Sequence, residues 1–103
     1  MTNITIIKDT DETLVQTFED YDLSENDTGV FKFARNFGDA PIVTITGKVD
    51  VAENTITYDI PRSLTASMPI DGDVEEYVYE IECILSGQKK AVEQGNLYIH
   101  NTI

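Results

Sequence analysis

The sequence predicts an all-β protein: an immunoglobulin-like antiparallel β-sandwich of seven to eight strands, with at most one short helical turn. Apolar and polar residues alternate through most of the chain, as they do in strands with one buried face. Turn-forming residues separate these runs at fairly regular intervals, and no stretch has a long helical period. A chain of 103 residues supports one hydrophobic core, so residues 1–103 are expected to form a single domain. A small closed barrel is the alternative architecture.

The first half of the chain is predicted to form short strands joined by polar turns. Alternation places these strands at residues 4–7, 13–18, 30–35 and 42–51. Residues 20–29 (DYDLSENDTG) are rich in turn formers and have no apolar period, so a solvated acidic loop is expected there. Gly47 lies inside the last of these runs and predicts a bulge or a bend.

The second half continues the same pattern. Alternation predicts strands at residues 54–60, 75–85, 89–93 and 97–103. Pro61 ends the first of them, and residues 62–68 (RSLTASM) are compatible with a single helical turn in which Leu64 and Met68 share one side. Residues 71–73 (DGD) predict a turn, and residues 86–88 (SGQ) predict a hairpin connection.

The stretch 75–87 (EEYVYEIECILSG) has two different faces. One face carries Tyr77, Tyr79, Ile81, Cys83 and Leu85, and the other carries Val78, Glu80, Glu82 and Ile84. The first face is expected in the core. Glu80 and Glu82 are expected to be exposed, where they keep the second face hydrated and discourage unwanted strand pairing.

Charge and composition exclude several classes of function. The net charge is −12 and the pI is about 4.1, which oppose binding to nucleic acid and to anionic membranes because both need a basic surface. The N-terminus has no secretory signal pattern, and no apolar run is long enough to span a bilayer. The chain is therefore expected to be made and kept in a cytoplasm unless a larger particle carries it out. Its single cysteine permits neither an internal disulfide nor a thiolate metal cluster.

No metal site is expected. Asp22, Ser24 and Asn26 alternate like the first ligands of a helical-hand calcium loop. The loop pattern then fails, because Asp27 stands where glycine is needed for the turn and Phe33 stands where a bidentate glutamate is needed.

No catalytic or cofactor-binding residue is expected either. Asp71, Asp73, Glu75 and Glu76 form an acidic cluster, but hydrated carboxylates in a turn do not acquire the separated pKa values that acid–base catalysis needs. Cys83 and His100 could only serve as a nucleophilic pair if they met, and Cys83 belongs to an apolar face where thiols are inert. No glycine-rich phosphate loop is present. We therefore expect a protein that is not an enzyme and that has no small-molecule substrate.

Short motifs in residues 54–103 carry a family resemblance. A strand ending at Ile60 is followed by a Leu-Thr pair, a Gly-Asp turn, a Tyr-x-Tyr-Glu strand and a Gly-x-Leu closing strand; these are Leu64-Thr65, Gly72-Asp73, Tyr77 to Glu80 and Gly95 to Leu97. In this order the chain resembles the immunoglobulin-like β-sandwich domain at the N-terminus of phage baseplate upper proteins and related small tail proteins of phages and prophages.

The resemblance implies a small structural protein of a phage or prophage that docks onto a tail or baseplate assembly and has no enzymatic role. Its partners would be tail or baseplate proteins, with homo-oligomers forming on assembly, and it would be located in the virion tail after synthesis in the bacterial cytoplasm. Docking would use an edge strand or an exposed sheet face. Two alternatives remain open: an acidic inhibitor that mimics DNA, and a carbohydrate-binding or adhesive sandwich.

Overall fold

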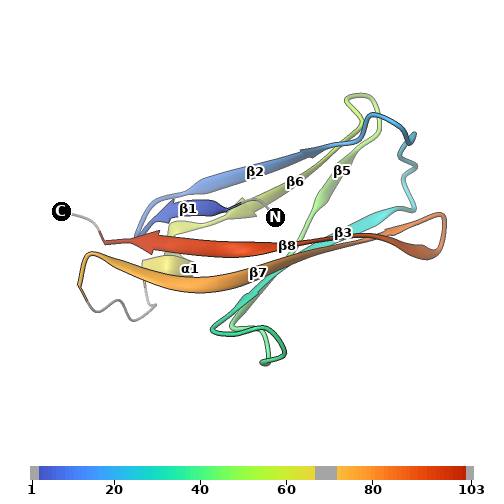
Figure 1. Ribbon diagram of the computed structural model, residues 1–103. Coiled ribbons are helices and arrows are strands. Elements are labelled where there is room, and N and C mark those ends of the chain that lie inside the picture. The colour runs from blue at the N-terminus through green and yellow to red at the C-terminus, as the bar shows by residue number, and fades with distance from the viewer. Residues whose placement is uncertain (1–2, 67–71, 102–103) are drawn as a thin grey trace.

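The computed structural model describes residues 3–66 and 72–101, which form a β-sandwich (Figure 1). Within these residues the larger sheet has the strand order β1-β8-β7-β3-β4, and the smaller sheet has the order β2-β6-β5. The elements are β1 (Ile4–Ile7), β2 (Glu12–Thr17), β3 (Thr28–Ala34), β4 (Val43–Thr46), β5 (Lys48–Asp50), β6 (Thr55–Ile60), α1 (Arg62–Ala66), β7 (Val74–Leu85) and β8 (Gln88–His100). The predicted all-β sandwich with one short helical turn is confirmed.

The strand order is that of an immunoglobulin-like sandwich. The run β8-β7-β3-β4 corresponds to the G-F-C-C′ strands of that fold, and β2-β6-β5 corresponds to the B-E-D strands. One pairing departs from the expected antiparallel arrangement. β1 runs parallel to β8, with Ile4 opposite Leu97 and Ile7 opposite His100. These strands come from opposite ends of the chain, so no tight turn constrains their directions.

Gly47 is the point at which the chain passes from one sheet to the other. The predicted single strand 42–51 was wrong, because β4 belongs to the larger sheet and β5 to the smaller one. A Cβ atom at Gly47 would lie 2.4 Å from Cγ2 of Ile56 and 2.7 Å from Cε1 of Tyr58. The main chain therefore approaches these core side chains too closely for any residue but glycine, and the bend expected at Gly47 is confirmed.

β7 and β8 form one long hairpin. Ser86 and Gly87 both have positive φ angles, of 53° and 76°, as a two-residue type I′ turn requires. The two separate strands predicted at 89–93 and 97–103 are in fact one strand. β8 continues between them because Gln94 pairs with Glu80 and Asn96 pairs with Val78. Residues 102–103 of the predicted last strand lie outside the described residues.

The core is aromatic along the middle of the larger sheet. The rings of Phe31 and Tyr79 stack with their centroids 5.7 Å apart, and Phe33 packs edge-on against Tyr77 at 6.3 Å. Tyr79, Ile81 and Leu85 are buried, as the alternation predicts. The smaller sheet covers them with Ile56, Tyr58 and Ile60.

Short helix α1 closes one end of the sandwich. Its Thr65 is fully buried, and the Thr65 hydroxyl accepts a hydrogen bond of 3.0 Å from the main-chain N–H of Asp9. The helical turn predicted for residues 62–68 is confirmed for residues 62–66. Met68, expected on the same side as Leu64, lies outside the described residues.

The loop that joins β2 to β3 is held in place at the opposite end. The side-chain amide of Asn54 donates to the carbonyl of Tyr21 at 2.7 Å and accepts from the N–H of Leu23 at 2.8 Å. Leu23 is buried. The expectation of a solvated loop at residues 20–29 was therefore wrong in part, because Leu23 and Asp27 are buried.

Candidate docking surfaces and buried polar clusters

Cys83 and His100 lie on opposite faces of the larger sheet. Cys83 is fully buried between the sheets, and burial is the main cause that raises the pKa of its thiol. His100 is exposed, and it lies opposite Val74 at the other end of β7 from Cys83. The fold therefore does not bring the two side chains together as a nucleophilic pair.

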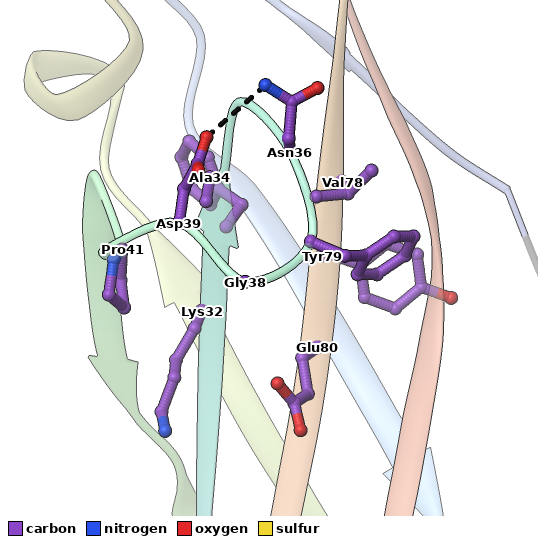
Figure 2. A pocket seen from close by; sticks show the side chains of 11 residues that line it. Lys32, Ala34, Asn36, Gly38, Asp39, Pro41, Val78, Tyr79 and Glu80 are labelled. Carbon is purple, nitrogen blue, oxygen red and sulfur yellow. Dashed lines mark hydrogen bonds between the residues drawn. The ribbon is translucent and has the colours of Figure 1, made fainter.

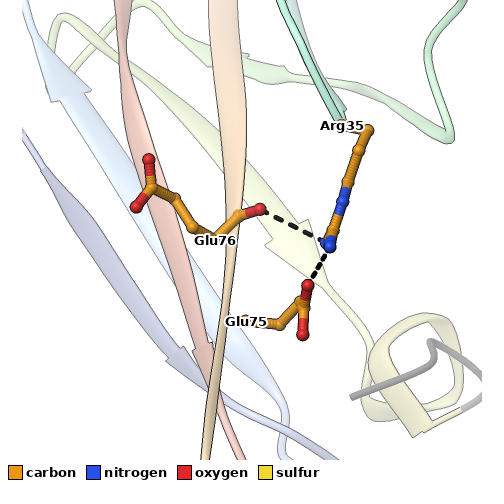
Figure 3. A network of polar contacts seen from close by, with 3 residues as sticks. All are labelled: Arg35, Glu75 and Glu76. Atoms are coloured by element: carbon orange, nitrogen blue, oxygen red, sulfur yellow. Dashed lines mark hydrogen bonds and ion pairs between the residues drawn. The ribbon is translucent and has the colours of Figure 1, made fainter. Parts of the chain in front are cut away.

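The residues of the predicted acidic cluster have different surroundings in the structure. Figure 3 shows Arg35 between Glu75 and Glu76: its guanidinium forms an ion pair with the Glu75 carboxylate and donates to the Glu76 carbonyl at 3.4 Å. The Arg35 guanidinium also lies 4.9 Å from the centre of the Tyr77 ring. Glu75 thus has a cationic partner, while the Glu76 side chain is exposed. Of the remaining members, Asp73 is exposed and Asp71 lies outside the described residues.

Asp27 is a structural anchor. Its carboxylate accepts hydrogen bonds of 2.9 Å from the N–H of Ser24, the N–H of Ser86 and the hydroxyl of Tyr21. The hydrogen bond from the Ser24 main chain is the largest cause that lowers the pKa of Asp27, followed by the one from Ser86. These bonds tie the β2–β3 loop to the β7–β8 turn.

The residues of the partial calcium-loop pattern differ in their surroundings. Asp22, Ser24 and Asn26 are exposed, whereas the carboxylate of Asp27 is already occupied by main-chain donors. Over the part of the chain that the structure describes, no group of three or more His, Cys, Asp or Glu side chains is arranged to hold a metal ion.

The side of the larger sheet that faces away from the smaller sheet is called the outer face here. Glu80 and Glu82 lie on it, as expected, but they are half-buried rather than exposed. The ammonium of Lys32 lies 3.8 Å from the Glu82 carboxylate, and Lys32 is the register partner of Glu80. These long side chains cover one another, which explains the partial burial.

The β3–β4 connection folds back over the outer face and encloses a small cavity. Figure 2 shows the cavity between Lys32 of β3, Val78 and Glu80 of β7, and Gly38 and Asp39 of the loop. Its volume is about 50 Å³, which suits one or two water molecules and excludes an ordinary substrate.

Most of the large exposed apolar side chains among the described residues lie on or beside this outer face. Among the described residues, seven large hydrophobic side chains are exposed, and five of them lie on the outer face or on the β3–β4 connection: Ile7, Phe37, Ile42, Val74 and Ile84. Ile7 and Val74 flank His100 in register across three strands. Exposed apolar side chains on one face make that face a candidate interaction surface.

A second polar cluster lies between the sheets. Oε1 of Gln16 accepts hydrogen bonds from the Tyr58 hydroxyl at 3.1 Å and from the Cys83 thiol at 3.3 Å. Glu93 lies on the same inward side, and its carboxylate accepts from the Tyr79 hydroxyl at 3.4 Å. Burial, together with the charge of Glu93, raises the pKa of Tyr79 to about 12.

Glu93 and Gln16 also line an open cavity of about 180 Å³, together with Ile4, Leu14, Val15, Tyr58 and Ile81. Tyr58 and Ile81 were expected on inward faces from the sequence, whereas Glu93 and Gln16 were given no role. Glu93 could have been placed on the inward side, because it is an even number of residues before Leu97 and Ile99 in one strand.

In the part of the chain that the structure describes, β8 is only partly covered along the edge that faces away from β7. It pairs with β7 over its whole length, but β1 covers only residues 97–100 (Figure 1). Among the described strands none pairs with this edge of β8 between residues 88 and 95. An unpaired sheet edge is a surface onto which another strand can add.

Comparison with known proteins assigns no family. No protein-family model matches the chain, and no curated protein matches it. Among solved structures, the chain is similar to murine CRIg. The match covers 98% of this chain and 92% of the CRIg chain, with 12% sequence identity and a TM-score of 0.40. At that TM-score the likeness carries no argument about function. The only helix among the described residues is too short to cross a membrane.

Proposed function

We propose that this protein is a small, non-enzymatic structural component that docks onto a phage or prophage tail or baseplate assembly. The observation that carries the proposal is that most of the large exposed apolar side chains of the described residues lie on or beside the outer face of the larger sheet. The kind of assembly, a phage or prophage tail or baseplate, is inferred from the motif resemblance in residues 54–103.

The outer face suits docking to a protein surface. Ile7, Val74 and Ile84 provide apolar contact area, while Glu80 and Glu82 lie between Val74 and Ile84 along β7. A partner surface with apolar positions and a few basic side chains would complement both features. The charge of −12 keeps free copies apart by repulsion, so association waits for a complementary partner.

The alternative functions have weaker support. A DNA mimic needs carboxylates in a regular line, whereas many exposed carboxylates here lie in the β2–β3 loop, at the end of β5 and in the β5–β6 turn: Glu19, Asp20, Asp22, Glu25, Asp50 and Glu53. A carbohydrate-binding face commonly presents exposed aromatic rings, with tryptophan foremost, and the chain contains no tryptophan.

The experiment uses phage particles purified from a strain that carries the gene. The protein should be detected in the particles by mass spectrometry and located on the tail by immunogold electron microscopy. Its absence from purified particles would contradict the proposal.

Two variants test the docking face directly. Ile84→Asp should reduce incorporation into particles, because it places a charge on the outer face. Val51→Asp is the matched control: Val51 is also exposed, but it lies in the turn between β5 and β6 of the smaller sheet. Incorporation that is equally reduced in both variants, or unchanged in both, would exclude the outer face as the docking surface.

A further inference from the structure

We propose that the uncovered edge of β8, from residue 88 to residue 95, accepts an extended strand from a partner protein, and that this strand places a lysine or arginine beside Glu93. The inference concerns a different surface from the outer face and holds whichever assembly the protein joins.

The main chain of β8 directs usable groups toward this edge. The N–H of Lys8 donates to the carbonyl of His100 at 2.8 Å, so the main-chain groups of His100 point toward the β1 side. Alternate residues of a strand direct their N–H and C=O groups to the same side. Gln94 and Val92 therefore present an N–H and a C=O each to the uncovered edge, where an incoming strand can bond to them.

The cavity beside this edge provides room for the side chains of an incoming strand. Its volume is about 180 Å³, and it is bounded by Ile4 at the start of β1 and by Leu14, Val15 and Gln16 of β2. It therefore lies in line with β1, between the uncovered edge of β8 and the edge strand of the smaller sheet. A strand added to β8 would direct every second side chain into this space.

The chemistry of the cavity selects a basic side chain. The Glu93 carboxylate lines it and is half-buried. None of the lysine and arginine side chains that the structure describes forms an ion pair with Glu93. Among the described residues, the Tyr79 hydroxyl is its hydrogen-bond donor, at a long distance of 3.4 Å. A partly desolvated carboxylate with spare acceptor capacity is stabilised most by a charged donor such as an ammonium or guanidinium group.

The probe for the test is a dye-labelled peptide, Thr-Val-Thr-Lys-Thr-Val-Thr, with blocked ends. In the extended peptide the central lysine lies on the same side as the two valines, whichever direction the peptide runs. We expect saturable binding by fluorescence anisotropy and slower hydrogen exchange at the amides of Val92 and Gln94. No exchange protection of these amides at millimolar peptide would overturn the inference.

Three variants separate specific strand addition from general charge attraction. Glu93→Gln should weaken peptide binding by about tenfold, whereas Glu82→Gln should change it by less than about twofold, although each removes one charge from a half-buried glutamate. Gln94→Pro removes an edge N–H without touching the pairing with β7 and should abolish binding, with its fold checked by thermal melting. Equal effects of the two glutamate variants would mean non-specific attraction and would overturn the inference without bearing on the proposed function.

Discussion

The Sγ atom of Cys83 on β7 lies 3.3 Å from Oε1 of Gln16 on β2, so a thiol–amide hydrogen bond joins the two sheets. In antibody domains a disulfide joins the B and F strands, to which β2 and β7 correspond. Here Tyr58 donates to the same Gln16 oxygen at 3.1 Å. In this protein β2 and β7 are therefore linked through a shared hydrogen-bond acceptor, Oε1 of Gln16, and not through a covalent bond.

Replacing the shared acceptor should destabilise the protein. Gln16→Leu leaves the buried Tyr58 hydroxyl with only the distant sulfur of Cys83 as a partner, which should lower the free energy of unfolding by about 1–3 kcal/mol. Adding Tyr58→Phe removes the hydroxyl that has lost its acceptor and should recover part of the lost free energy of unfolding. Urea unfolding of the two single variants and the double variant measures this; strictly additive losses would mean that the two side chains are not coupled.

The thiol of Cys83 should be inert in the folded protein. Burial raises its pKa and excludes reagents, so labelling with a disulfide reagent at pH 8 should be on the order of a hundredfold slower than in denaturant. The release of the coloured thiolate product reports the rate. Rapid labelling under native conditions would show that the sheets separate readily at this position.

Truncation on the two faces of β7 should have unequal effects. Ile81→Ala should reduce the free energy of unfolding by roughly 2–5 kcal/mol because it leaves a cavity in the core. Glu80→Ala, one residue earlier and on the outer face, should change it by less than about 0.5 kcal/mol. Thermal melts compare the two, and equal losses would mean that the register of β7 is shifted by one residue.

Gly47 should not tolerate a side chain. Gly47→Ala forces a methyl group against Ile56 and Tyr58 and should lower the free energy of unfolding by about 1–3 kcal/mol. The neighbouring Thr46 is exposed, so Thr46→Ala serves as the control and should stay within about 0.5 kcal/mol of the parent. A neutral Gly47→Ala variant, measured by urea unfolding, would contradict the close approach described for this crossing.

Asp27 should contribute stability that depends on pH. Its pKa in the folded state is lowered from the ordinary value of 3.8, so its charged form is favoured by folding. The stabilisation is present in full above that ordinary value and is lost as the pH falls through the lower, folded-state pKa. The stability difference between the parent and Asp27→Asn should therefore be constant from pH 7 to about pH 5 and should shrink toward pH 2. A difference that grows in acid would contradict the assignment.

Local patterns in the sequence were sufficient for the buried faces of the strands. The alternation around Ile81 identifies the core side of β7, and the Ser86-Gly87 pair identifies the hairpin that follows it. These features depend on neighbouring residues in the chain, where period-two burial and turn geometry leave a direct trace.

Contacts between segments that are distant in the sequence could not be predicted from such local patterns. Alternation continues through Gly47 while the chain changes sheets, so periodicity alone could not show the switch. The burial of Asp27 depends on the N–H of Ser86, which is 59 residues away. Glu93 was missed as a cavity residue because the partners that make its position informative, Gln16 and Tyr58, belong to the other sheet.

The parallel pairing of β1 with β8 has a mechanical consequence. Ile4 begins the first strand and His100 ends the last, and the two strands run in the same direction. A force that pulls the two ends of the chain apart therefore slides β1 along β8 and loads their hydrogen bonds together in shear, rather than peeling them open one at a time. Resistance to such a force is governed by the rate of unfolding rather than by equilibrium stability. A domain tethered at both ends in an assembly under tension would bear load through this pair of strands.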